Sequence, residues 1–310
     1  MSLLRLASIA AFIFFLSNPK FSDPSLIHSN PSDFDAILPT VTDKLGPEVL
    51  DMAQARTKIL ANYGVGYSHI DTHATQKLGI TVTNTPDVLS DCTADLAMTL
   101  LLMVARRAGE GEREIRSGNW SGWRPTHLMG SKVTGKTLGI VGFGRIGQAM
   151  AQRAYHGFGM KIVVHNRSPV KQAILKRYNA TQVATLDDLL PQSDFVSLHC
   201  PGGAENRHLM NNRRLELMKP DAFLINTARG EVIDEYALAQ SLMFGCIGGA
   251  GLDVYQGEPK ISSHLLQCDN LVVLPHLGSA SIETRNEMGN RVVQNLIEFF
   301  NGREPLDKVA

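Results

Sequence analysis

The chain has 310 residues, of which 30 are Lys or Arg and 30 are Asp or Glu, so its formal net charge is zero. This balance argues against a nucleic-acid-binding protein, which would normally carry a basic surplus, and 44% hydrophobic residues is typical of a globular chain. At roughly 100–200 residues per domain, the length predicts two domains.

The N-terminus carries an apolar stretch, Leu6–Leu16, that is interrupted only by Ser8. As a helix it is too short to span a bilayer. It has the length of a signal-peptide core, but only Arg5 provides charge before it and no A-x-A site follows. We therefore expect a buried strand over Ala11–Leu16 and a cytoplasmic protein without a membrane partner, with targeting as the alternative.

The first third of the chain alternates strands with a helix. Residues 18–39 are rich in proline and small polar residues, which predicts a loop broken by one short strand at Asp35–Leu38. Further strands are predicted at Lys58–Tyr63 and Ile80–Thr85, with a helix over Ile70–Leu78 between them. This order predicts a parallel sheet.

A helix predicted over Thr93–Arg107 is apolar on nearly every face, so it should be buried, either in a core or at a subunit interface. After a turn-rich segment, Gly118–Pro125, α/β alternation resumes at Thr137 and ends in a helix over Ile282–Phe300. Strands are predicted at 138–141, 161–165, 194–199, 222–226, 249–254 and 270–274, and helices at 144–155 and 169–178. The chain is thus predicted to form two α/β units that meet near residue 90.

The cysteines are Cys92, Cys200, Cys246 and Cys268, and none forms a CxxC pair. Without such a pair or a histidine cluster, no metal site is expected. A chain of this length does not need disulfides, so reduced thiols in a cytosolic protein are the preferred interpretation.

Glycines mark a predicted phosphate-binding turn. The motif Gly142-Phe-Gly144-Arg-Ile-Gly147 follows a short apolar strand and opens a helix, which is the context that a dinucleotide-binding motif requires. Gly142 would form the tight turn, Gly144 would let the backbone approach a pyrophosphate, and Gly147 would let helix and strand pack closely. The helix N-terminus would supply N–H donors for the anion.

The next strand ends in Asn166, Arg167 and Ser168, at about the 20-residue distance where an NAD site places an acidic residue. A carboxylate there would bind the ribose 2′-OH and repel a 2′-phosphate. A neutral amide, a cation and a hydroxyl instead favour NADP(H), with NAD(H) also possible. The alternative is that Arg167 is an ordinary surface charge.

Three side chains that could take part in binding or catalysis follow later strands. Arg229 could hold a carboxylate with two hydrogen bonds, although a surface ion pair explains it equally well. Glu258 lies in a turn, and His276 ends the next predicted strand. A glutamate bonded to a histidine stabilises the imidazolium and makes it a competent acid near neutral pH. Asp253 could accept a bond from a nicotinamide amide or simply cap a loop.

Two more histidines, His165 and His199, also end strands, and we interpret both as structural or cofactor-edge residues.

From about Asp33 to Leu306 the sequence resembles the D-isomer-specific 2-hydroxyacid dehydrogenases, and within them the glyoxylate/hydroxypyruvate reductase group. The motifs that carry this resemblance are Asn62–Gly66, Asn84–Pro86, Thr93–Ala97, Gly122–Pro125, Gly142–Gly147, Asn226–Gly230, Gly251–Val254, Gly257–Pro259 and Pro275–Ser279. The resemblance implies an α/β fold in which a Rossmann-type coenzyme domain (89–280) is inserted into a flavodoxin-like, discontinuous substrate domain (1–88 and 281–310).

The resemblance also implies roles. Arg229 would hold the substrate carboxylate and polarise the keto group, His276 would be the acid/base, and Glu258 its partner. Val65 and Gly66 would bind the carboxylate through backbone N–H groups. Asp253 would face the nicotinamide. Further cofactor contacts are implied at Thr93, Arg145, Ile146, Cys200, Pro201, Thr227, Ala228 and Gly278.

A homodimer joined through the coenzyme domains is implied as well, with Trp123 or Trp120 reaching the neighbouring active site. The expected activity is NADPH-preferring reduction of glyoxylate and hydroxypyruvate to D-2-hydroxy acids, without a metal. A 2-ketogluconate-type reductase and a non-catalytic nicotinamide-sensing protein are the alternatives; formate dehydrogenases pair the histidine with Gln, so Glu258 speaks against them. The sequence departs from the family at its start, where we expect a first helix to be absent.

Overall fold

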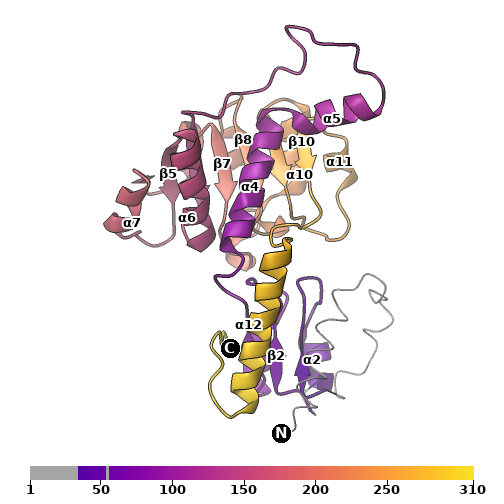
Figure 1. The fold of residues 1–310 in the computed structure, drawn as a ribbon, viewed down its shortest axis with the longest axis vertical. Coiled ribbons are helices and arrows are strands. Elements are labelled where there is room, and N and C mark those ends of the chain that lie inside the picture. Colours follow the sequence, from indigo (N-terminus) through magenta and orange to yellow (C-terminus); the bar gives the residue numbers. More distant parts are fainter. Residues whose placement is uncertain (1–33, 54–55) are drawn as a thin grey trace. The chain divides into compact units, whose positions relative to one another are not determined.

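The computed structural model describes residues 34–53 and 56–310, and the chain divides into two compact units (Figure 1). Unit 1 comprises the described residues up to Leu89 together with Ser281–Ala310, and unit 2 comprises Ser90–Ala280. The expected strand at Ala11–Leu16 and the expected loss of a first helix lie outside the described residues. Both units are parallel sheets with helices, so the predicted α/β fold class is confirmed.

Unit 1 is built on three parallel strands in the order β1-β2-β3. They are β1 (Ala36–Ile37), β2 (Ile59–Ala61) and β3 (Thr81–Thr83), and the helices are α2 (Pro47–Ala53), α3 (Thr72–Lys77) and α12 (Ile282–Phe300). All three residues of β2 are buried, and their side chains alternate between two cores. Leu60 packs with Leu50 and Ile70, whereas Ile59 packs with Val292 and Leu296 of α12. Helix α12, which lies near the C-terminal end of the sequence, therefore packs on this N-terminal sheet.

Unit 2 holds a seven-stranded parallel sheet in the order β10-β9-β8-β7-β4-β5-β6. The strands are β4 (Thr137–Val141), β5 (Lys161–His165), β6 (Thr181–Gln182), β7 (Phe195–Leu198), β8 (Phe223–Asn226), β9 (Gly249–Leu252) and β10 (Leu271–Val273). The chain adds strands on one side of β4 and then on the other, so the strand order reverses at β4. In open α/β sheets, ligands bind in the crevice at the carboxyl ends of the strands at such a reversal.

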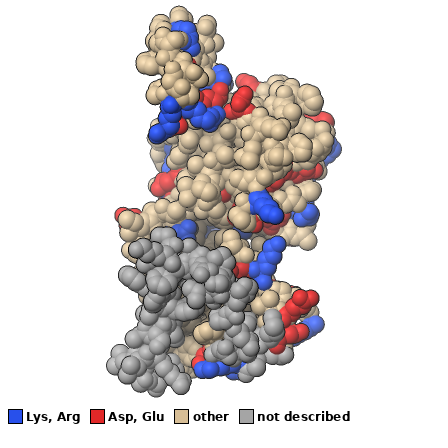
Figure 2. Space-filling view, turned by 90° about the vertical axis from the view of Figure 1, so that its right-hand side faces the viewer, with Lys and Arg blue, Asp and Glu red and all other residues tan. Residues whose placement is uncertain are grey.

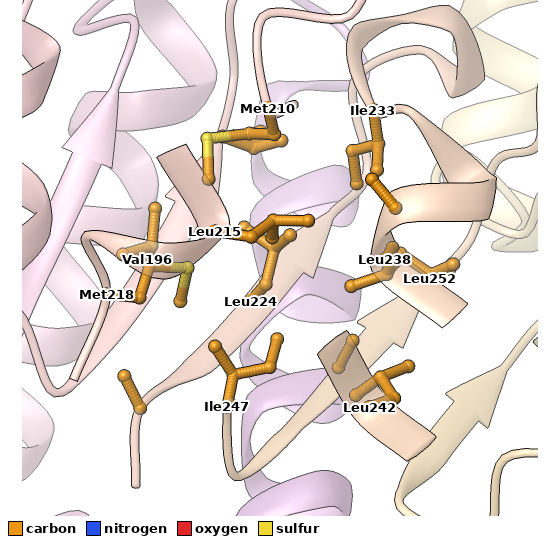
Figure 3. Close-up of a cluster of buried hydrophobic side chains, with 14 of the residues drawn as sticks. Val196, Met210, Leu215, Met218, Leu224, Ile233, Leu238, Leu242, Ile247 and Leu252 are labelled. Carbon is orange, nitrogen blue, oxygen red and sulfur yellow. The ribbon is translucent and has the colours of Figure 1, made fainter. Parts of the chain in front are cut away.

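Helices cover both faces of this sheet. They are α4 (Ser90–Ala105), α5 (Ala108–Arg116), α6 (Arg145–Gln152), α7 (Gln172–Arg177), α8 (Leu186–Leu189), α9 (Asn212–Glu216), α10 (Glu235–Met243) and α11 (Ser263–Leu266). Alternate side chains of β8 point to opposite faces: Phe223 and Ile225 join one core and Leu224 the other. Figure 3 shows the second core, where Leu224 lies among Leu215 and Leu238.

Helix α4 contacts β8, β9, β10 and α6, and its buried side chains belong to the core of unit 2. The sequence left open whether this apolar helix lies in a core or at an interface, and within the chain it is a core helix. The predicted helix over 144–155 is wrong in one respect: the α-helical part ends at Gln152, and Arg153–Gly157 forms a π turn. Arg153 there donates to the Ala149 carbonyl and pairs with Asp91 and Asp95.

Helix α5 and the loop after it extend away from the sheet of unit 2 (Figure 1). None of the α5 residues is buried. On the face shown in Figure 2, Lys and Arg side chains are scattered among Asp and Glu. No helix of the described residues has the length and apolar character needed to cross a membrane.

Candidate active site

The glycine turn that follows β4 has the geometry that a pyrophosphate needs. Gly142 has φ +91°, and a Cβ there would lie 2.7 Å from the Cys200 nitrogen. A Cβ on Gly147 would lie 2.3 Å from the Gly142 carbonyl oxygen. This oxygen belongs to the backbone, so it could shift only by distorting the turn. Gly144 is exposed and precedes the first turn of α6, and a Cβ added there would have no heavy atom of the described chain within 4 Å. Its surface is therefore open to a ligand.

These two glycines should respond differently to alanine. Gly147→Ala should lower both the melting temperature and cofactor affinity, because the new methyl group collides with the turn itself. Gly144→Ala should leave the melting temperature unchanged and weaken NADPH binding by about tenfold or more, because its methyl group would meet only the pyrophosphate. Differential scanning fluorimetry and titration calorimetry on both variants measure the two effects. Full NADPH affinity in Gly144→Ala would contradict a pyrophosphate at this turn.

The end of β5 is tied to this turn. Asn166 accepts a hydrogen bond from the Phe143 N–H through Oδ1 (3.0 Å) and donates from Nδ2 to the Ser168 carbonyl (2.9 Å). Arg167 points to another partner, since its Nη1 donates to Glu205 Oε1 at 2.6 Å. The sequence does not indicate that Glu205 pairs with Arg167, because the two residues are far apart in the chain.

The ends of β7 and β8 supply the next predicted cofactor contacts. Burial raises the pKa of the Cys200 thiol to about 11, so this thiol is neutral at physiological pH. Thr227 is buried, and its Oγ1 has no hydrogen-bond partner in the part of the chain that the structure describes. A buried hydroxyl without a partner is costly, which fits a group that a ligand would satisfy. Asn226 braces the turn by accepting from the Ala228 N–H and donating to the Arg229 carbonyl.

Arg229 holds its guanidinium close to two carboxylates. Burial lowers the pKa of Arg229, while the negative charges of Glu231 and Glu258 raise it. The only hydrogen bond of this guanidinium among the described residues runs from Nη1 to the Ala228 carbonyl (2.8 Å). A guanidinium has five donors, so most of them remain available for an anionic ligand.

His276 and Glu258, the residues expected to act as acid/base and partner, are in hydrogen-bond contact. His276 Nδ1 lies 2.7 Å from Glu258 Oε2, and Glu258 Oε1 accepts the Tyr255 N–H at 2.9 Å. Burial raises the pKa of Glu258, but the bonds from His276 and the Tyr255 N–H, together with the nearby positive charges, bring it below its usual value. Glu258 is therefore a carboxylate at neutral pH. With Nδ1 bound to it, Nε2 is the ring nitrogen that can face a substrate.

Asp253 fixes the loop that carries His276. The side chain is fully buried, and its two oxygens accept the Leu277 N–H (2.7 Å) and the Gly278 N–H (2.8 Å). Thr93 donates to the Gly278 carbonyl at 3.0 Å. These bonds hold His276 at φ +55°, a conformation that non-glycine residues adopt rarely. Asp253 thus caps this loop, and its role toward a nicotinamide amide stays a prediction. Burial raises its pKa to about 6.

The loop Gly64–Gly66 lies in unit 1, and its carbonyls are all bonded. Asn62 Nδ2 donates to the carbonyls of Gly64 (2.8 Å) and Gly66 (3.2 Å), and Asn84 Nδ2 donates to that of Val65 (2.8 Å). Among the described residues, the three backbone N–H groups of this loop donate no hydrogen bond to a backbone carbonyl. Backbone N–H groups without a backbone partner are what an anion-binding loop offers to a ligand. Asn62 bonds carbonyls of its own motif, Asn62–Gly66, whereas the Asn84 contact joins two motifs that are distant in the sequence.

The remaining predicted residues are placed as follows. The loop after α5 carries Trp120 and Trp123, with exposed fractions of 53% and 82%. His199 is half-buried and its Nε2 lies 2.9 Å from Ser197 Oγ, and burial lowers its pKa to about 4, so the ring is neutral at physiological pH. The four cysteines are free thiols.

Comparison with known proteins identifies relatives over most of the chain. The family model described as D-isomer specific 2-hydroxyacid dehydrogenase, NAD binding domain, matches residues 98–278. A glyoxylate reductase of Thermococcus litoralis is 46% identical over 292 residues, which cover 93% of this chain and 87% of that protein.

Solved structures agree with this result. An NADPH-dependent glyoxylate/hydroxypyruvate reductase from Sinorhizobium meliloti, in complex with NADP and malonate, is 37% identical with a TM-score of 0.83, over 93% of this chain and 88% of that one. A D-mandelate dehydrogenase from Rhodotorula graminis is 30% identical with a TM-score of 0.83, over 89% and 84% of the two chains.

Proposed function

This chain belongs to the D-isomer specific 2-hydroxyacid dehydrogenases, a family of oxidoreductases, and from that premise we propose that it reduces glyoxylate and hydroxypyruvate to D-2-hydroxy acids with a preference for NADPH. The observation that carries the proposal is the hydrogen-bonded pair His276–Glu258 at the strand-end edge that also holds Arg229. A protonated histidine, its carboxylate partner and a guanidinium are the groups that reduction of a 2-oxo acid needs.

When bound, the reduced nicotinamide supplies a hydride for the keto carbon. His276 gives the proton on Nε2 to the keto oxygen, and Glu258 stabilises the imidazolium through Nδ1 before the transfer. Arg229 binds the substrate carboxylate and stabilises the negative charge that develops on the keto oxygen.

The residues for the cofactor fit a dinucleotide. The open backbone at Gly144 and the start of α6 would hold the pyrophosphate, and the unpartnered Thr227 hydroxyl would gain a polar partner. Arg167 and Ser168 would hold the 2′-phosphate of NADPH. The Sinorhizobium meliloti relative, named as NADPH-dependent, supports this preference.

We propose further that two chains form a homodimer through unit 2 and that the exposed Trp123 or Trp120 of one chain reaches the site of the other. The exposed side chains of Trp123 and Met129 on the extended loop support an interface there, because exposed apolar groups mark interaction sites. The free thiols fit a cytoplasmic location.

Steady-state kinetics with glyoxylate, hydroxypyruvate and 2-ketogluconate, each with NADPH and NADH, test the function. We expect turnover of the first two substrates, with kcat/KM higher for NADPH than for NADH by about 10–100-fold. This factor corresponds to the free energy that a hydrogen bond to a charged group contributes. A clear preference for NADH would refute the role of Arg167. Binding of NADPH without oxidation by any of the three acids would favour the nicotinamide-sensing alternative.

A further inference from the structure

The two loops on either side of β4 are joined by an ion pair. Strand β4 lies between β5 and β7, so the loops that leave β5 and β7 flank the Gly142–Gly147 turn. Arg167 follows β5, and Glu205 lies in the 3₁₀ turn Ala204–Asn206 after β7. The Arg167 Nη1 to Glu205 Oε1 distance is 2.6 Å, so this pair links the two loops beside the proposed nucleotide site.

This ion pair can be exchanged for a ligand. The side chains of Arg167 and Glu205 are 81% and 60% exposed. Ion pairs between such exposed side chains contribute little to stability, because water solvates both partners well and screens their attraction. A phosphate group with more negative charge than a carboxylate can therefore replace Glu205 as the partner of Arg167.

Glu205 also supplies the acidic group that is missing from the end of β5. Asn166, Arg167 and Ser168 include no carboxylate, whereas the β7 loop brings the Glu205 carboxylate to 2.6 Å from the Arg167 guanidinium. A carboxylate at this place accepts a hydrogen bond from a ribose 2′-OH and repels a 2′-phosphate. The site therefore holds one charge that favours NADPH, on Arg167, and one that favours NADH, on Glu205.

We propose that Glu205 is a specificity-determining residue for the cofactor, an inference that rests on the proposed function. Its carboxylate competes with the 2′-phosphate of NADPH for Arg167, opposes that phosphate by charge, and accepts the 2′-OH of NADH. Glu205 thus limits the preference for NADPH that Arg167 creates and keeps NADH usable.

Titration calorimetry of NADPH and NADH binding to the full chain tests this without depending on turnover. In Glu205→Gln, the ratio of the NADH Kd to the NADPH Kd should rise by about tenfold at low ionic strength, because one negative charge near the 2′-phosphate is removed. The increase should shrink as salt is added, since both side chains are exposed. Glu216→Gln, on the exposed face of α9, removes the same charge elsewhere in unit 2 and is the matched control.

The outcomes separate the two proposals. A ratio that stays at the wild-type value in Glu205→Gln, or that changes equally in Glu216→Gln, overturns the role of Glu205 while leaving the reductase intact. A wild-type chain that binds neither cofactor contradicts the proposed function itself. A ratio that rises in Glu205→Gln alone supports the inference, whatever the substrate proves to be.

Discussion

Replacing His276 by alanine should lower kcat for glyoxylate reduction by about 10²–10⁴-fold, the usual contribution of a general acid. The Kd for NADPH should remain at the wild-type value, because the ring is bonded to Glu258 and not to the glycine turn that would hold the cofactor. Stopped-flow kinetics and calorimetry measure the two quantities. His73→Ala, on the exposed surface of α3, controls for the loss of any histidine.

Glu258→Gln separates the charge of this partner from its hydrogen bonds. A glutamine oxygen can still accept the Nδ1 proton, but it no longer stabilises the imidazolium by charge. The kcat for glyoxylate reduction should therefore fall in Glu258→Gln, while the Kd for NADPH stays at its wild-type value. A kcat near that of the wild type in Glu258→Gln or in His276→Ala would refute the acid/base assignment.

The elements that the sequence predicts best are those whose capping residues and hydrophobic pattern lie in or next to the element itself. Helix α12 spans Ile282–Phe300, as predicted, because a cap and an apolar stripe both lie within the segment. Ser281 caps its first turn by accepting the Thr284 N–H at 3.2 Å. Six of the seven strands of unit 2 are equally visible in the sequence, since buried parallel strands form short apolar runs between turn residues. Strand β6, Thr181–Gln182, has no apolar residue and is not predicted.

Helix α5 is not predicted by the sequence, because it has no buried side chain and thus no apolar period. It is held by polar pairs instead, such as the two bonds from Arg107 to Glu110 at its start. The π turn at Arg153 escapes prediction for a related reason: its side chain pairs with Asp91 and Asp95 of α4, which no local pattern around residue 153 reveals.

Some residues of the candidate site could likewise be predicted from the sequence, and others could not. Arg229, Glu258 and His276 could be proposed from the sequence, because each follows a recognisable strand and ligands bind at strand ends. The residues that hold the site could not be assigned. Asn84 donates to a carbonyl of another loop, Gly64–Gly66, and Glu205 bonds to a residue that only the sheet order brings near. Contacts of this kind depend on tertiary structure alone.

Replacing Arg229 by glutamine should lower kcat/KM for glyoxylate by about 10³-fold, because the site then loses the charged donor that both binds the substrate and stabilises the oxyanion. Arg229→Lys should recover only part of this loss. Lysine keeps the positive charge but lacks the planar guanidinium that can bond both carboxylate oxygens. If lysine restored full kcat/KM, two-point binding of the carboxylate would be wrong.

The pH dependence of the two variants then identifies what the charge of Arg229 does. The positive charge of Arg229 is one of the effects that hold the pKa of Glu258 below its usual value. Its removal raises that pKa, so Glu258 takes up a proton at higher pH and stops stabilising the imidazolium sooner as the pH falls. The acidic fall of kcat should therefore move to higher pH in Arg229→Gln and stay near its wild-type position in Arg229→Lys. An acidic limb that moves equally in both variants would show that the geometry of the guanidinium, and not its charge, acts on the pair.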